Sequence, residues 1–217
     1  TRDVISLFKL RIGVLIMITA LVGMAVSPGP APGLAQVLVL ALSVLIASAS
    51  AGAFNQYVEH ESDRLMARTR KRAFGNGALP HHPAGLNHMA VLQAAAWLVL
   101  NAAAALYVFL GAFFYGVVYT LWLKRRTALN IVIGGLAGSF AVLAGAAAID
   151  PNLGPLPVLL ALVLFLWTPP HFWSLAIANK TDYADAGVPM LPVVVGTPRA
   201  ARIVFWSTLA LAFTALM

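Results

Sequence analysis

LAQVLVLALSVLIASASAGAF, residues 34–54, is an apolar run without a single charged side chain. A helix needs about 20 mostly apolar residues to cross the hydrocarbon core of a bilayer. Directly after this run the sequence becomes polar, as NQYVEHESDRLMARTRKR at residues 55–72. Similar apolar runs alternate with short charged segments along the rest of the chain. This alternation predicts an all-α, polytopic transmembrane helical bundle.

The composition agrees with a membrane protein. Of 217 residues, 61% are hydrophobic and 10% are charged. A soluble domain usually carries about 25% charged residues, because its surface faces water. There is no cysteine, which excludes disulfides, thiolate metal sites and cysteine nucleophiles. The formal charge of +7 comes from basic clusters between apolar runs, a pattern that favours a membrane face and not a nucleic-acid partner.

The basic residues also predict the topology. The chain has 14 lysines and arginines, and the loops at 28–33 and 150–157 contain none of them. All of them lie on one side of the membrane only if residues 89–123 form two spans with a tight turn near Asn101. We therefore expect about seven spans and a cytoplasmic N-terminus. The other spans are expected at 12–27, 34–54, 130–148, 158–178 and 203–217.

A row of oxygen-bearing side chains begins where the second span ends. Asn55, Glu59 and Asp63 are spaced by four residues, so a helix places them on one face. Acids stacked in this way repel each other and need a cation. Mg²⁺ suits such a face, because it commonly binds a few carboxylates together with substrate phosphates. The alternative is a solvated loop in which the acids pair with Arg64 and Arg68.

A second polar cluster follows the penultimate span, on the same predicted side. Asp182 and Asp185 lie in NKTDYAD at residues 179–185. Carboxylates at two helix ends can hold a diphosphate between them through Mg²⁺. Solvation or N-capping is the alternative explanation for each acid taken alone. Two acidic clusters at one end of the bundle favour a metal–diphosphate site.

Two aromatic segments have ordinary structural explanations. YTLWLKRRT at residues 119–127 has the composition of an interfacial aromatic belt followed by basic anchors. WTPPHFW at residues 167–173 places Pro169 and Pro170 inside an apolar run, where we expect a helix break. His171, beside that break, is either a ligand for heme iron or a buried, hydrogen-bonded histidine.

Five segments, in this order, are similar to the heme O synthase (protoheme farnesyltransferase) branch of the UbiA-type intramembrane prenyltransferases. They are N-x-x-x-E-x-x-x-D-R-x-M-x-R-T at 55–69, Y-T-x-W-L-K-R-R-T at 119–127, N-I-V-I-G-G at 130–135, W-T-P-P-H-F-W at 167–173 and D-Y-x-x-A-G-V-P-M-L-P at 182–192. The first is typical of the superfamily, and the second and fourth are typical of the heme branch. The chain departs from the family pattern at 71–73, at 140–141 and at Ala186, where the superfamily places an acid four residues after Asp182.

The resemblance implies a bundle of nine helices around a lipid-accessible cavity, capped on the cytoplasmic side. Residues 1–217 are then expected to form a single transmembrane prenyltransferase domain that lacks its last helices. The implied reaction transfers a farnesyl group from farnesyl diphosphate to a vinyl group of protoheme IX, which gives heme O. Mg²⁺ is the implied cofactor, the bacterial inner membrane the implied location, and heme A synthase or oxidase assembly proteins the implied partners.

The resemblance also implies roles for particular residues. The metal and catalytic residues are Asn55, Glu59, Asp63 and Asp182. The diphosphate-binding residues are Arg68, Arg72, Lys124, Arg125 and Lys180. His171 is the implied heme-binding residue.

The residues alone leave two other functions open. One is a prenyltransferase for another aromatic acceptor, such as a quinone precursor, which would share the acid motif but not the heme-branch segments. The other is a non-catalytic heme-handling transporter or assembly protein, for which charged residues along a pathway inside the spans are expected. The spans carry almost no charge and the acids gather at one end. This distribution favours an enzyme with its site at the membrane surface.

Overall fold

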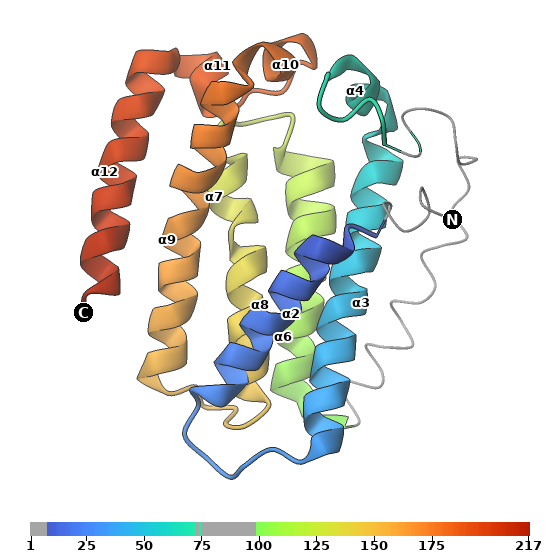
Figure 1. Ribbon diagram of the computed structural model, residues 1–217, viewed down its shortest axis with the longest axis vertical. Helices are drawn as coiled ribbons and strands as arrows, with labels where there is room; N and C mark the ends of the chain where they lie inside the picture. Colours follow the sequence, from blue (N-terminus) through green and yellow to red (C-terminus); the bar gives the residue numbers. More distant parts are fainter. Residues whose placement is uncertain (1–7, 73, 75–98) are drawn as a thin grey trace.

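The structure is a computed structural model that describes residues 8–72, 74 and 99–217. Its described residues are helical or in connecting segments, and they contain no β-strand. The long helices lie side by side in a bundle (Figure 1). The elements are α2 (Leu10–Ala25), α3 (Leu34–Val58), α4 (His60–Leu65), α6 (Ala102–Phe113), η2 (Phe114–Leu123), α7 (Asn130–Gly134), α8 (Leu136–Ala147), α9 (Pro155–Ala178), α10 (Lys180–Asp185), α11 (Leu191–Val195) and α12 (Thr197–Ala215).

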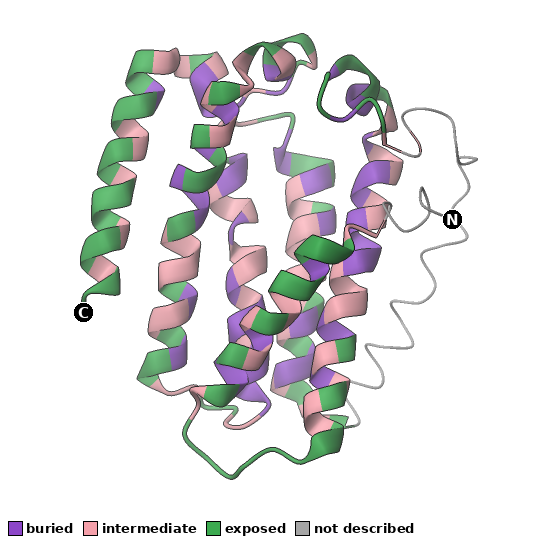
Figure 2. Cartoon of the chain, viewed as in Figure 1, coloured by how far each residue is buried: buried purple, intermediate pink, exposed green. Residues whose placement is uncertain are grey.

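The expected membrane-spanning bundle is confirmed as a fold class. In the described part of the chain, four helical segments are long and apolar enough to cross a bilayer: Leu34–Val58, Ala102–Leu123, Asn130–Ala147 and Pro155–Ala178. The shorter α2 is apolar too, and large apolar side chains such as Leu15 and Leu38 point outward. Figure 2 shows this exposed exterior around a buried centre. An apolar outer surface of this kind suits lipid and not water.

The turn expected near Asn101 begins a helix. Asn101 is the N-cap of α6, and its Oδ1 accepts a hydrogen bond from the backbone N–H of Ala104 at 2.8 Å. Its Nδ2 donates to the backbone oxygen of Ala147 at 2.7 Å, which ties the start of α6 to the end of α8. The second span expected between residue 89 and this turn lies mostly outside the described residues.

Small residues bring α2 and α8 into close contact. A Cβ atom placed on Gly145 would lie 1.7 Å from the backbone oxygen of Ala20, and one on Gly23 would lie 2.2 Å from that of Val142. No side chain fits at either position without moving a helix backbone. Ala20 and its neighbours on α8 are fully buried there. The absence of side chains therefore sets the distance between these two helices, as small residues commonly do in membrane bundles.

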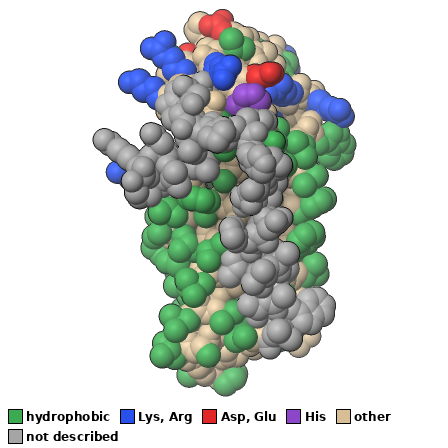
Figure 3. All heavy atoms as spheres, turned by 90° about the vertical axis from the view of Figure 1, so that its right-hand side faces the viewer, with side chains coloured by type: hydrophobic (Ala, Val, Ile, Leu, Met, Phe, Trp, Pro, Cys, Tyr) green, Lys and Arg blue, Asp and Glu red, His purple; other side chains and the backbone are tan. Residues whose placement is uncertain are grey.

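The polar segments gather at one end of the bundle. In Figure 1, α4, α10, α11 and the connection between η2 and α7 lie at the upper end. The connections between α2 and α3 and between α8 and α9 lie at the lower end. Figure 3 shows the basic and acidic side chains concentrated at the upper end, above sides covered by apolar groups. This arrangement agrees with the expected clustering of charge on one face.

The expectation of a helix break at the double proline was wrong. Pro169 and Pro170 lie inside α9, which continues to Ala178. Both prolines are buried together with Thr168, whose side chain closely faces Gly135. Packing against the neighbouring helices thus holds this segment in helical form although two backbone donors are missing.

Candidate active site

The oxygen-bearing row at the end of α3 forms as the spacing predicts. Helix α3 ends at Val58 and α4 begins at His60, but the backbone hydrogen bonds continue through the junction. The N–H of Glu59 donates to the oxygen of Asn55 at 3.0 Å, and the N–H of Asp63 donates to that of Glu59 at 2.8 Å. Exposed fractions are 3% for Asn55, 2% for Glu59 and 0% for Asp63. The three side chains therefore form a buried polar row, not a solvated loop.

Each acid of the row faces a basic side chain from further along the chain. Lys124 Nζ lies 2.5 Å from the Glu59 carboxylate. One guanidinium nitrogen of Arg72 lies 2.9 Å from both carboxylate oxygens of Asp63. Buried carboxylates need such partners, because an isolated charge in a low-dielectric interior is very costly. The diphosphate candidates Lys124 and Arg72 are therefore placed directly at the acids.

Lys9 completes the row, and sequence reasoning missed it. Its Nζ donates to Asn55 Oδ1 at 2.7 Å and to Tyr115 Oη at 3.1 Å. Asn55 Nδ2 in turn donates to Glu59 Oε2 at 2.8 Å, so the amide links the lysine to the acid. A lysine just before an apolar span is usually an interfacial anchor. Nothing in its local sequence indicates a contact with a residue 46 positions away.

Part of the aromatic segment at 119–127 lies beside the acids. Residues 119–123 are the end of η2, a π-helix, where the N–H of Lys124 donates to the oxygen of Tyr119, five residues back, at 2.9 Å. The rings of Tyr115 and Tyr119 stack with centroids 5.8 Å apart. The ammonium of Lys9 lies 5.8 Å from the Tyr115 centroid and that of Lys124 lies 5.9 Å from the Tyr119 centroid. π-Helical turns often occur at functional sites, and this one brings two rings and a lysine to the acids.

Thr120 anchors η2 to the polar row. Its hydroxyl accepts a hydrogen bond from Asn55 Nδ2 at 3.2 Å. It donates to the backbone oxygen of Tyr115 at 2.8 Å. The Asn55 side chain, on α3, is therefore hydrogen-bonded to Glu59, to Thr120 of η2 and to Lys9 at the start of α2, which fixes the orientation of its amide.

The second acidic cluster meets the first. The backbone N–H of Arg68 donates to Asp182 Oδ2 at 3.3 Å, and the Arg68 guanidinium donates to Tyr183 Oη at 3.4 Å. These contacts join the segment after α4 to α10, across more than a hundred positions of sequence. Asp185 is exposed. The convergence of the two clusters at one end of the bundle is as the sequence predicts.

The remaining candidates lie at different places. Arg125 is exposed and contacts the Ser62 hydroxyl beside the polar row. Lys180 begins α10 and is partly exposed. His171 lies on α9, and its ring stacks on that of Trp167 with centroids 4.2 Å apart. His171 is exposed on the protein surface and so is not a buried core histidine.

Burial changes the proton affinity of the two lysines at the row. It lowers the pKa of Lys9 to about 7, and the nearby cations Arg72 and Lys124 act in the same direction. It also lowers the pKa of Lys124, although Glu59 opposes this effect. Desolvation disfavours the charged form of a lysine. Both ammonium groups are therefore easier to deprotonate than those of lysines at a water-exposed surface.

The donor set fits a magnesium ion in chemistry. Asn55, Glu59, Asp63 and Asp182 offer amide and carboxylate oxygens, which Mg²⁺ prefers. In the described part of the chain, no three histidine or acidic side chains are close enough together to hold a metal. The oxygens of Asn55, Glu59 and Asp63 are directed at Lys9, Lys124 and Arg72. Lys124 and Arg72 thus lie where the two carboxylates require positive charge.

Comparison with known proteins identifies the family of the chain. Residues 16–217 match the model of the UbiA prenyltransferase family. The chain is 56% identical to protoheme IX farnesyltransferase 2 of Paramagnetospirillum magneticum, over 98% of this chain and 75% of that protein. It is 48% identical to protoheme IX farnesyltransferase 1 of the same organism, over 100% of this chain and 77% of that protein.

The fold has a close counterpart among solved structures. A UbiA homologue from Archaeoglobus fulgidus, solved with DMAPP and Mg²⁺ bound, has a TM-score of 0.82 with this chain. The alignment covers 98% of this chain and 76% of that one at 16% sequence identity. Fold and sequence relatives thus agree on one architecture, that of an integral membrane protein. The chain belongs to the UbiA prenyltransferase family, within the branch of the protoheme IX farnesyltransferases.

Proposed function

We propose that this chain transfers a farnesyl group from farnesyl diphosphate to a vinyl group of protoheme IX, which gives heme O. The observation that carries the proposal is the meeting of two acidic clusters, joined by the Arg68–Asp182 contact, beside buried basic side chains at one end of an apolar bundle. A diphosphate head group needs the charged end, and a 15-carbon chain needs the apolar interior.

In this proposal Asn55, Glu59, Asp63 and Asp182 hold Mg²⁺ together with the diphosphate. The bound metal stabilises negative charge on the leaving diphosphate. Three of these side chains are buried and fixed by hydrogen bonds, so their oxygens are preorganised for a cation. Preorganised groups of this kind contribute more to transition-state stabilisation than groups in water do.

The basic residues bind and neutralise the leaving group. Arg68, Arg72, Lys124, Arg125 and Lys180 all lie at the charged end. The C–O bond of farnesyl diphosphate breaks, and its electron pair leaves with the diphosphate. The vinyl group then forms a C–C bond with the farnesyl carbon. Water adds to the resulting cationic carbon beside the porphyrin and releases a proton, which completes the hydroxyethylfarnesyl group.

The stacked rings of Tyr115 and Tyr119 form the wall nearest the acids. Aromatic faces stabilise nearby positive charge, so this wall suits the allylic cation that forms on ionisation. The apolar helices below it keep out water until the C–C bond has formed.

The proposed acceptor side involves His171 and its stacked neighbour Trp167. Their parallel rings on α9 offer a flat, partly polar surface to a porphyrin. The site would face the cytoplasm of a bacterium from its inner membrane, with the N-terminus on the same side. Heme A synthase or oxidase assembly proteins would then receive the product.

The deciding experiment incubates the purified chain with farnesyl diphosphate, protoheme IX and Mg²⁺ and follows heme O by mass spectrometry. A parallel set replaces protoheme with aromatic acids and quinone precursors. Among the acceptors, we expect only protoheme to give a prenylated product. We expect no product after Mg²⁺ is removed by a chelator. Prenylation of another acceptor in preference to protoheme would assign the chain to a different branch. Heme binding without any transfer would favour a heme-handling role.

A further inference from the structure

The backbone of Lys9 has an unusual conformation just before α2. Its φ is 46° and its ψ is 43°, in the left-handed region that non-glycine residues rarely occupy. Within the described residues only Leu153 is a second non-glycine residue with positive φ. Such conformations persist where the surroundings hold the residue in place, and they occur often at functional sites. The backbone oxygen of Lys9 accepts hydrogen bonds from the N–H groups of Ile12 and Gly13, and its side chain makes the contacts with the polar row.

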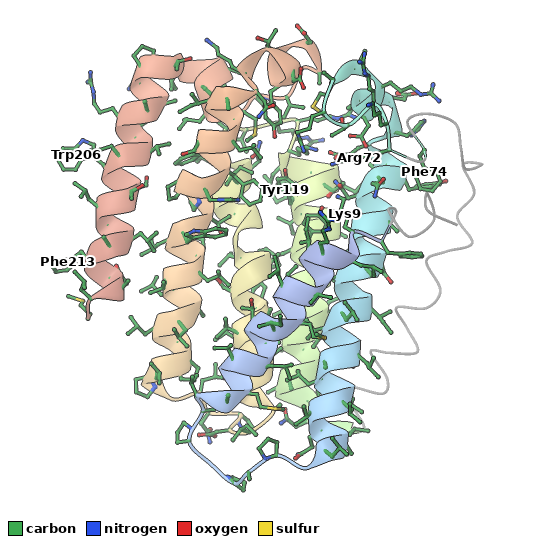
Figure 4. All side chains as sticks on the ribbon, in the orientation of Figure 1. Lys9, Arg72, Phe74, Tyr119, Trp206 and Phe213 are labelled. Atoms are coloured by element: carbon green, nitrogen blue, oxygen red, sulfur yellow. The ribbon has the colours of Figure 1, made fainter. Side chains whose placement is uncertain are left out.

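The side chain of Lys9 packs against Gly52 of α3. A Cβ atom on Gly52 would lie 3.4 Å from Lys9 Cδ and 3.7 Å from its Cβ and Cγ. The lysine stem therefore lies across α3 where that helix has no side chain, one turn before Asn55. Figure 4 shows Lys9 close to the level of Tyr119 and Arg72, near the charged end of the bundle. The stem ends with the ammonium on Asn55 Oδ1.

The charges around the polar row are not balanced. Among the described residues, the row has two carboxylates, and hydrogen bonds or ion pairs join it to the side chains of Lys9, Lys124 and Arg72. Lys124 and Arg72 pair with the two acids. Lys9 instead faces a neutral amide oxygen, so in its protonated form it is the surplus cation of these three. A divalent metal that arrived alone would add to this surplus, whereas a metal that arrives with a diphosphate brings several negative charges.

We propose that Lys9 is a tethered cation that competes with a metal ion for Asn55 Oδ1 and so makes metal binding depend on the diphosphate. This inference rests on the assignment of Asn55 to the metal site under the proposed function. A metal ion and the ammonium compete for the same oxygen. The negative diphosphate compensates the charges of both the metal ion and the Lys9 ammonium. Only then is the binding free energy of the metal large enough to displace Lys9 from Asn55 Oδ1. Metal and diphosphate then bind cooperatively, and linkage requires that each raises the affinity of the other by the same factor.

The test measures metal binding directly. The full chain is purified in detergent, and Mn²⁺ replaces Mg²⁺ because its free form is visible by electron paramagnetic resonance. Binding is measured for Mn²⁺ alone and for Mn²⁺ with inorganic diphosphate, after correction for the complex that the two form in solution. Lys9→Met keeps the length of the side chain and removes its charge. Arg11→Met removes a charge from the exposed side of α2, two residues away, and is the matched control.

The wild type and Arg11→Met are expected to bind Mn²⁺ alone weakly and to bind it much more tightly with diphosphate. Lys9→Met is expected to bind Mn²⁺ alone about tenfold tighter than the control, with a cooperative effect of diphosphate reduced by a similar factor. Equal affinities for Mn²⁺ alone in Lys9→Met and Arg11→Met would overturn the proposal. If Lys9→Met is poorly folded, Lys9→Gln keeps a hydrogen-bond donor for Asn55 and the same comparison applies.

Two further outcomes separate this inference from the proposed function. Unchanged Mn²⁺ binding in Asn55→Ala, with and without diphosphate, would show that Asn55 is not a metal ligand. It would overturn the role of Lys9 as well. Normal cooperative binding of Mn²⁺ and diphosphate without any transfer to protoheme would contradict the proposed reaction and leave the role of Lys9 supported.

Discussion

A single guanidinium nitrogen of Arg72 lies 2.9 Å from each carboxylate oxygen of Asp63. Asp63 is fully buried, and the Arg72 side chain is 24% exposed. The charge of this acid therefore has a partner within the protein. The four-residue spacing alone suggests that removing the charge of Asp63 would relieve its repulsion with Glu59. The structure shows that this change would also leave the partly buried Arg72 without its ion pair.

We expect Asp63→Asn to lower the rate of farnesyl transfer by on the order of 10²–10³, as when one preorganised electrostatic contact is lost. The free energy of unfolding is expected to fall as well, by about 1–3 kcal/mol, because Arg72 loses a charged acceptor. Transfer is measured across a Mg²⁺ titration, and thermal unfolding is measured in parallel. Glu61→Gln, at an exposed position on α4, is the control and should retain activity. Full activity of Asp63→Asn at ordinary Mg²⁺ would remove the first acidic cluster from the metal site.

For His171→Ala we expect weaker binding of protoheme and unchanged binding of farnesyl diphosphate. The stacked His171–Trp167 pair lies on α9, about seven residues or 10 Å before the end of that helix. The substitution removes the ring that would face the porphyrin without touching Glu59 or Asp63 of the polar row. Heme titration by absorbance and a separate diphosphate binding assay measure the two affinities. A well-folded variant with normal heme affinity would give His171 a purely structural role.

The orientation in the membrane can be tested with single cysteines, because the chain contains none. Leu65 is 62% exposed at the charged end, Leu129 is 55% exposed there, and Asn152 is exposed at the opposite end. We expect Leu65→Cys and Leu129→Cys to react with an impermeant maleimide only when the cytoplasmic face is accessible. Asn152→Cys should react in intact cells after removal of the outer membrane. The reverse pattern would invert the proposed orientation, and equal labelling of residues 65 and 152 from one side would contradict the bundle.

The helix contact between α2 and α8 can be tested with two glycines of the same helix. Gly145→Ala places a methyl group 1.7 Å from the backbone oxygen of Ala20, whereas one at Gly138 would lie 3.5 Å from Leu164, an ordinary contact. We expect Gly145→Ala to destabilise the bundle by about 1–3 kcal/mol or more, since overpacking forces backbone shifts. Gly138→Ala should change the free energy of unfolding little. Thermal unfolding in detergent compares the two, and equal midpoints would mean that α2 and α8 are not held at this distance.

The sequence alone predicts what depends on composition and local spacing. The apolar runs indicate the spans, and the four-residue spacing of Asn55, Glu59 and Asp63 places them on one face, as the backbone hydrogen bonds confirm. The common side of the basic clusters correctly brings Lys124 near the acids. These features need no knowledge of which helices touch.

The rest depends on tertiary packing. Lys9 has the same local surroundings as any anchoring lysine, and only the crossing of α2 over α3 brings it to Asn55. An apolar sequence such as that of η2 does not distinguish an α-helix from a π-helix. Pro169 and Pro170 are local helix breakers, but the burial of their segment between neighbouring helices overrides that tendency.

The close approach of α2 to α8 also bears on the position of Lys9. Gly145 leaves room for the backbone of Ala20, and Lys9 lies about 16 Å from Ala20 along the axis of α2. A small tilt of α2 about this contact therefore moves the ammonium group of Lys9 further than it moves Ala20. The fit of two helix backbones thus helps to set the position of one charge at the polar row. A larger side chain at Gly145 is expected to shift that charge without contacting any residue of the row.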